Sequence, residues 1–113
     1  MRTLPQTDTN ITITADEPGL YGASHAYTLT VTDTIRYNLH FQEGPIREAG
    51  INGISNEALL AVIIDRIRGF QSSRLPCREN AIALTHLETA ALWLEQRTLN
   101  RKARGIEGTG KDI

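Results

Sequence analysis

The stretch ENAIALTHLETAALWLEQRTLNRKAR, residues 79–104, predicts the longest element of the protein. Its apolar residues recur three, four and three positions apart, which is the spacing of a helix that packs along another helix. These residues are Leu84, Leu87, Ala91 and Leu94. At about 1.5 Å per residue, such a helix extends about 40 Å. We therefore interpret this stretch as one arm of a helical hairpin.

The preceding segment predicts the other arm. Ser55 is typical of a residue that caps a helix N-terminus, and apolar residues then follow at helical spacing to about Phe70. Residues 71–76, QSSRLP, interrupt the pattern with two serines and a proline, so we expect the two helices to fold back on each other. The first helix is only about 24 Å long, so the last turns of the second overhang it.

Alternation with a period of two in the first third of the chain predicts a half-buried sheet. The alternating runs contain Ile11 and Ile13, then Tyr27, Leu29 and Val31, then Ile35, Tyr37, Leu39 and Phe41. Only residues 32–34 separate the last two runs, which predicts an antiparallel hairpin.

These patterns together predict an α+β fold in a single domain, with a small N-terminal antiparallel sheet followed by a long antiparallel two-helix hairpin. The expected regions are a sheet over 9–42, a loop over 43–55, a helical hairpin over 55–104 and a glycine-rich tail over 105–113. Apolar residues of the second helix, Trp93 among them, spread around its whole circumference. One partner helix cannot cover them all, so we expect Trp93 in a core and the chain in a homo-oligomer.

Composition narrows the class of protein. Hydrophobic residues make up 40% of the 113 and charged residues 22%, which is typical of a folded globular chain. No apolar run is long enough for a membrane span or a leader, and a single cysteine fits a reducing compartment, so we expect a cytoplasmic protein. The net charge of −1 and the lack of an extended basic stripe argue against duplex nucleic acid as a partner.

Positive charge gathers late in the chain, and ten of the twelve basic residues are arginine. Arg97, Arg101 and Arg104 recur at i, i+4 and i+7, so they share one face near the end of the second helix. Arginine suits bidentate contact with phosphate, which makes this arginine ridge a candidate anion site. The alternative is that these arginines only offset the helix dipole and its free carbonyls.

The bend of the hairpin holds further candidates. Phe70 could stack on a base or plug the bend, and Asn80 could meet the edge of an adenine or cap the second helix. Cys77 adjoins a helix N-terminus and Arg78, which favours a thiolate, but no base can be placed beside it. No metal-ligand cluster or phosphate-cradling glycine loop occurs, so we expect no metal, no cofactor and no catalytic residue.

Three runs, in order, resemble the phage Thoeris anti-defence family of signal-sequestering sponges. They are FQEGPIREAGINGISNEALL (41–60), PCRENAIAL (76–84) and WLEQRTLNRKARGIEGT (93–109). The resemblance implies a protein, acting in the cytoplasm of an infected bacterium, that binds cyclic ADP-ribose isomers made by TIR-domain enzymes without degrading them. It also implies kinship with anti-CBASS sponges, a hexamer among the expected assemblies, and cyclic di- or trinucleotides as a second ligand class.

By motif, the resemblance assigns ligand binding to Phe70, Asn80, Arg97 and Arg101. Second-rank candidates are Gly44, Pro45, Arg74, Arg104, Gly105 and Thr109. Phe70 and Asn80 lie about 25 to 30 Å along the hairpin from the two arginines, so one ligand reaches all four only between chains of an antiparallel oligomer. The alternatives are a hydrolase or lyase that uses Cys77 on a nucleotide signal, and an adaptor hairpin without a small ligand.

Overall fold

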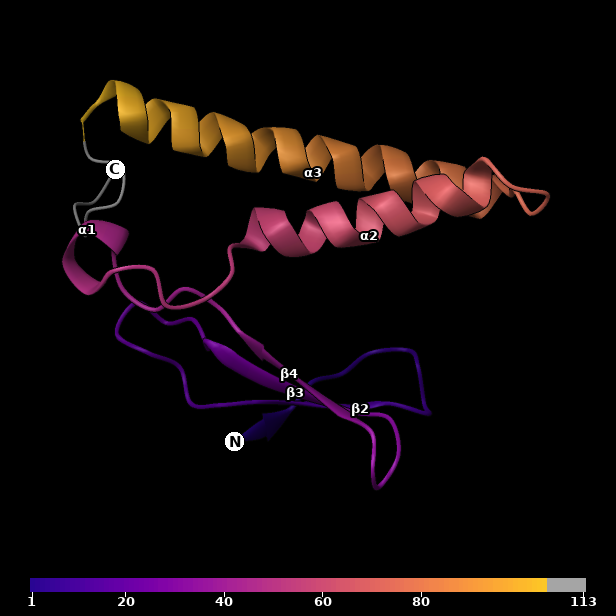
Figure 1. Ribbon diagram of the computed structural model, residues 1–113, viewed down its shortest axis with the longest axis horizontal. Coiled ribbons are helices and arrows are strands. Elements are labelled where there is room, and N and C mark those ends of the chain that lie inside the picture. The colour runs from indigo at the N-terminus through magenta and orange to yellow at the C-terminus, as the bar shows by residue number, and fades with distance from the viewer. Residues whose placement is uncertain (106–113) are drawn as a thin grey trace.

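The computed structural model describes residues 1–105 and confirms an α+β architecture in which a sheet precedes the helices. The strands are β1 (Arg2–Thr3), β2 (Thr12–Ala15), β3 (Ala26–Thr30) and β4 (Arg36–His40), and the helices are α1 (Ile46–Ala49), α2 (Asn56–Gln71) and α3 (Arg78–Ala103). Figure 1 shows the α2–α3 hairpin as one layer and the sheet as another, with α1 beside the end of the hairpin that is opposite the bend.

The sheet is an antiparallel meander in the order β1-β2-β3-β4. The predicted hairpin of β3 and β4 is confirmed, with Tyr27 paired to Leu39 across the two strands. Strand β1 was not predicted, because two residues are too short to show a period. It is added where Arg2 pairs with Ala15 of β2.

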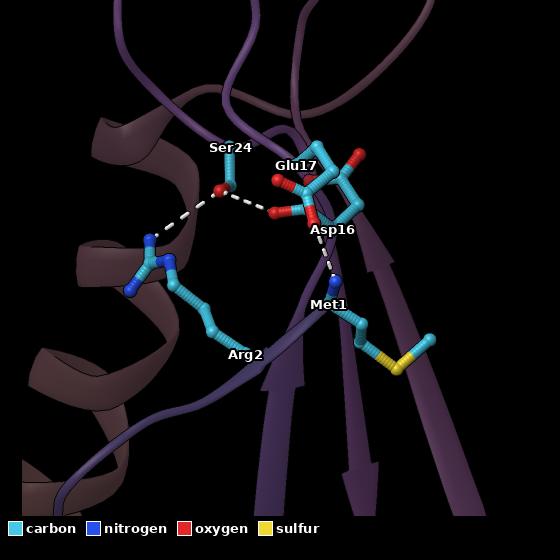
Figure 2. A network of polar contacts seen from close by, with 5 residues as sticks. All are labelled: Met1, Arg2, Asp16, Glu17 and Ser24. Carbon is cyan, nitrogen blue, oxygen red and sulfur yellow. Dashed lines mark hydrogen bonds and ion pairs between the residues drawn. The ribbon is translucent and has the colours of Figure 1, made fainter.

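Polar contacts fasten β1 to the turn that follows β2 (Figure 2). The amino group of Met1 lies 2.6 Å from a carboxylate oxygen of Glu17. Arg2 donates to Ser24 Oγ at 3.3 Å, and that hydroxyl donates to the carbonyl of Asp16 at 2.8 Å. Ser24 is buried, so this network satisfies a hydroxyl that would otherwise lack partners.

The expected loop before the hairpin contains the one-turn helix α1 and is held by two side-chain amides. Gln42 donates to the carbonyl of Gly50 at 2.7 Å and accepts from the backbone of Asn52 at 3.0 Å. Asn52 bonds to both backbone groups of Glu43. The chain then passes back beside the end of β4, where Ile54 bridges Phe41 in parallel.

The start of α2 and the end of α3 lie close to where the sequence predicts them. Ser55 accepts a hydrogen bond from the backbone of Ala58 at 3.1 Å, which confirms the predicted start of α2. Helix α3 ends at Ala103, close to the predicted end at Arg104, which is its C-cap.

No helix in the described part of the chain is long and apolar enough to cross a bilayer.

The two layers leave little core. Helices α2 and α3 are in backbone contact, but within residues 1–105 no strand contacts either of them in this way. Ala15 and Ile64 are the buried apolar side chains of the described residues. Trp93 is 71% exposed, so its expected place in a core is wrong for the single chain. The reason is geometric, since Trp93 lies on the side of α3 that faces away from α2.

Candidate functional site

The hairpin bend is built by side chains that bond to its backbone. Gln71, the last residue of α2, accepts from the backbone N–H of Cys77 at 3.0 Å and donates to its carbonyl at 3.1 Å. Ser73 Oγ donates to the carbonyl of Phe70 at 2.6 Å and accepts from Leu75 at 3.0 Å. These bonds fix where α2 stops and hold its last aromatic ring at the bend.

Phe70 is at the surface, with 38% of its area exposed, and does not plug the bend. The guanidinium of Arg66, one helical turn earlier, lies 5.1 Å from the centre of the ring, a cation–π distance. Both residues line a hollow of about 810 Å³, here called the bend hollow. Its lining is Val62, Asp65, Arg66, Gly69, Phe70, Ser73, Arg74 and Leu75.

Asn80 lies in the first turn of α3 and is half-buried. Its backbone N–H donates to Cys77 Sγ at 3.4 Å, so Cys77 is the cap and the alternative that Asn80 caps the helix is wrong. The side-chain amide of Asn80 makes no hydrogen bond within the described residues. It therefore keeps donors and an acceptor for a ligand, although it does not line the bend hollow.

The arginine ridge at the other end of α3 is not uniform. Arg97 is exposed, whereas Arg101 is buried with 7% of its area exposed. Arg104 is the C-cap, and its backbone N–H donates to Asn100 at 3.1 Å. Gly105 follows with a φ of 71°, a left-handed conformation that suits glycine at this position.

Arg97 also borders a second hollow, of about 680 Å³, between the sheet and the hairpin. The floor of this interlayer hollow is the apolar face of the sheet, where Tyr27 and Phe41 meet edge to face with centroids 5.7 Å apart. Ile46 of α1 and Leu59 of α2 complete its apolar wall. Arg97 thus borders a hollow that also holds an aromatic pair of its own chain, separate from Phe70, whereas Arg101 and Arg104 do not line it.

The second-rank candidates are divided between the hairpin bend and the opposite end of the hairpin. Arg74 lines the bend hollow. Gly44 has a φ of 83°, and a Cβ there would lie 3.1 Å from that of Ala49, so the turn before α1 favours glycine. Pro45 is the N-cap of α1. Thr109, with most of the tail, lies outside the described residues.

The four main candidates divide into two groups that are far apart. Phe70 and Asn80 flank the bend, and Arg97 and Arg101 lie about 25 to 30 Å away along α3. Figure 1 shows the bend and the last turns of α3 at opposite ends of the hairpin. One chain therefore does not bring the four side chains together.

Groups for catalysis are sparse in the described part of the chain. No three His, Cys, Asp or Glu side chains gather there as a metal site would require. Cys77 is exposed, and its sulfur accepts the cap bond from Asn80. The contact between Arg66 and Phe70 was not predicted from the sequence, although their spacing of four residues was the available signal.

Comparison with known proteins gives two matches. The sequence model of the Acb2/Tad1 hairpin domain matches residues 37–99, more than half of the chain. A protein of Bacillus phage SBSphiJ7 named Thoeris anti-defense 1 is 52% identical over 71 residues, which are 63% of this chain and 50% of that protein. The match thus spans about half the length of the relative, and the matched domain includes the bend and Arg97.

Proposed function

The chain belongs to the Acb2/Tad1 hairpin-domain family, and we propose that it is a phage anti-defence protein that binds and sequesters cyclic ADP-ribose isomers. The observation that carries this proposal is the match to the hairpin domain together with the identity to the phage protein. Such a protein acts in the cytoplasm of an infected bacterium, where TIR-domain immune enzymes make the signal. By holding the signal intact, it keeps the effector of the immune system inactive.

The chemistry of the candidate residues suits this ligand. Adenine offers a flat face for the exposed ring of Phe70 and polar edges for the side-chain amide of Asn80, which bonds to no group within residues 1–105. The pyrophosphate carries charge that arginine binds through paired N–H groups, which is the role proposed for Arg97 and Arg101. Sequestration needs no nucleophile, base or metal.

We place the site between chains, because the two pairs lie about 25 to 30 Å apart in one chain. In an antiparallel pair of hairpins, the bend of one chain lies beside the last turns of the other. Each chain then gives Phe70 and Asn80 to one site and Arg97 and Arg101 to a second. A two-fold pair of this kind holds two equivalent sites.

The exposed surface of the chain supports an assembly. The accessible area is 8528 Å², about 2,300 Å² more than a folded monomer of this mass exposes. The radius of gyration is 16.6 Å, against about 13 Å for a compact chain of this length. Surface of this extent matches what obligate homo-oligomers bury, so we propose a homo-oligomer, with a hexamer as the expected assembly.

The outer face of α3 carries part of this exposed apolar surface. Ile82, Leu92 and Leu99 are 41%, 64% and 50% exposed, and Trp93 is 71% exposed beside them. Ile82, Leu92 and Leu99 fall on one row of positions spaced by three and four, the spacing of a helix that pairs with another helix; the row also contains Thr85, Thr89 and Gln96. We propose that this outer seam packs against a second copy.

A thermal-shift titration followed by recovery of the ligand tests the proposal. Cyclic ADP-ribose isomers should raise the melting temperature by mass action, and heating should release them unchanged. Cyclic di- and trinucleotides form the second arm, since the family relationship makes them the second ligand class. If the ligand is recovered in an altered form, and Cys77→Ala no longer alters it, the protein is a hydrolase or lyase and not a sponge. If no ligand changes the melting temperature, the remaining alternative is an adaptor hairpin that binds no small ligand.

A further inference from the structure

The arginines that line the bend hollow differ in their ion pairing from the arginine next to it. Arg68 forms an ion pair with Glu88 and so joins α2 to α3. Arg66 and Arg74 both line the hollow, and neither forms an ion pair with a carboxylate among residues 1–105. Two guanidinium groups thus line one hollow with Phe70. The carboxylate in the lining, Asp65, is paired with neither of them among residues 1–105.

Arg66 has a defined position within this hollow. It precedes Phe70 by four residues, so the two side chains project from the same face of α2. The guanidinium lies 5.1 Å from the ring centre, and 38% of the area of Phe70 is exposed with Arg66 in place, so a stacking partner can reach this residue. Arg66 itself is exposed, so its planar group is within reach of a bound molecule.

We propose that Arg66 is a further ligand-binding residue, which backs the ring of Phe70 while a base stacks on the open side and which attracts the ligand's phosphate. This inference rests on the proposed function and adds a residue to its bend half-site. A guanidinium on an aromatic ring both orients the ring and adds positive charge beside it. The bend would then select a base that carries phosphate over a neutral nucleoside.

Calorimetric titration of the full chain with a cyclic ADP-ribose isomer tests this role. Arg66→Ala should weaken binding about tenfold, since it removes one stacked, charged contact. Arg66→Lys should restore only part of the loss, because an ammonium keeps the charge but not the planar stack. Arg66→Ala should also lessen the salt dependence of binding, and it should affect adenosine binding less than binding of the isomer.

Arg36→Ala is the matched control, because Arg36 is an exposed arginine of β4 that lines neither hollow. It should bind like the wild type, and all variants should keep the wild-type melting temperature without ligand. If the wild type binds the isomer and Arg66→Ala binds it equally well, the role of Arg66 is wrong while the proposed function stands. If the wild type binds no isomer, the proposed function itself fails, and the role of Arg66 fails with it.

Discussion

Cys77 is a residue for which the sequence suggested chemistry and the structure supplies a structural role. A thiol beside a helix N-terminus is a reasonable nucleophile, but here the sulfur accepts the N–H of Asn80 at 3.4 Å. That bond fixes the first turn of α3 and with it the position of a proposed ligand residue. The preference for a hydroxyl or carboxylate at this position explains why a sulfur cap was not predicted.

Cys77→Ala should lower the free energy of unfolding by about 0.5 kcal/mol, because one helix N–H loses its acceptor and the sulfur bond is weaker than an oxygen cap. Cys77→Ser should equal or exceed the wild type, since a hydroxyl is the better cap. Urea unfolding followed by circular dichroism measures both changes. A loss of stability in Cys77→Ser as large as that in Cys77→Ala would contradict the capping role.

Glu17 makes stability depend on pH. Its hydrogen bond to the Met1 amino group, and then the positive charge of that group, lower the pKa of this carboxyl below the ordinary 4.5. A lowered pKa in the folded state means that the stabilisation is present above the unfolded pKa and is lost as pH falls through the folded pKa. The contribution is small because the carboxylate is exposed and screened by water.

In the 113-residue chain, Glu17 should therefore titrate below 4.5 in an NMR pH series. Acetylation of the amino group removes the partner and should return the pKa of Glu17 toward its ordinary value. The difference in unfolding midpoint between the wild type and Glu17→Gln should narrow as the solution is acidified below 4.5. A Glu17 that titrates at its ordinary value before acetylation would refute the ion pair.

At the level of elements, the patterns that run over several turns were the ones that could be predicted. Helix α2 was found from its cap and apolar spacing, and the β3–β4 hairpin from its period of two. Helix α1 was missed because its turn is stabilised by side-chain amides of Gln42 and Asn52, which have no periodicity. Burial of Arg101 was also missed, since spacing gives a face of a helix but not what covers it.

Alanine substitutions at two glycines, Gly53 and Gly69, should change the stability in opposite directions. A Cβ at Gly53 would overlap the backbone of Phe41, so Gly53→Ala must push the loop away from the end of β4 and should cost about 2 kcal/mol. A Cβ at Gly69 meets nothing within 4 Å, and in the last turn of α2 alanine should add about 0.5 kcal/mol. Thermal unfolding of both variants compares them, and equal melting temperatures would refute the close approach at Gly53.

For the whole molecule, the thin core and the outer seam of α3 belong to one argument. A chain whose buried apolar side chains, within residues 1–105, are Ala15 and Ile64 gains little stability from its own interior. In the proposed assembly, a second copy covers part of its remaining apolar surface. The same assembly would bring the two distant groups of candidate residues together, so we expect stability and binding to depend on the same contact.

Leu92→Glu should therefore dissociate the assembly, because it places a charge on the outer seam where 64% of the leucine is exposed in the single chain. Light scattering after gel filtration should give a lower mass for this variant than for the wild type, and ligand binding should be lost with it. Ile51→Glu is the control, since Ile51 is 82% exposed but lies in the loop between α1 and α2 and lines neither hollow. An unchanged mass for Leu92→Glu would exclude the outer seam as the interface.

A site shared between chains predicts that two inactive variants complement each other. Phe70→Ala lacks the stacking ring in every site, and Arg97→Ala lacks a phosphate contact in every site, so each alone should bind the ligand weakly. In mixed two-fold pairs, one site carries both defects and the other carries neither. Refolding the two variants together in equal amounts should therefore restore about one quarter of the wild-type sites, since half of the pairs are mixed and each regains one of its two sites. Titration of the mixture counts those sites, and mixing the folded variants without refolding controls for weak binding by either parent. If all four residues instead contacted the ligand within one chain, the refolded mixture would bind no better than the average of the two variants.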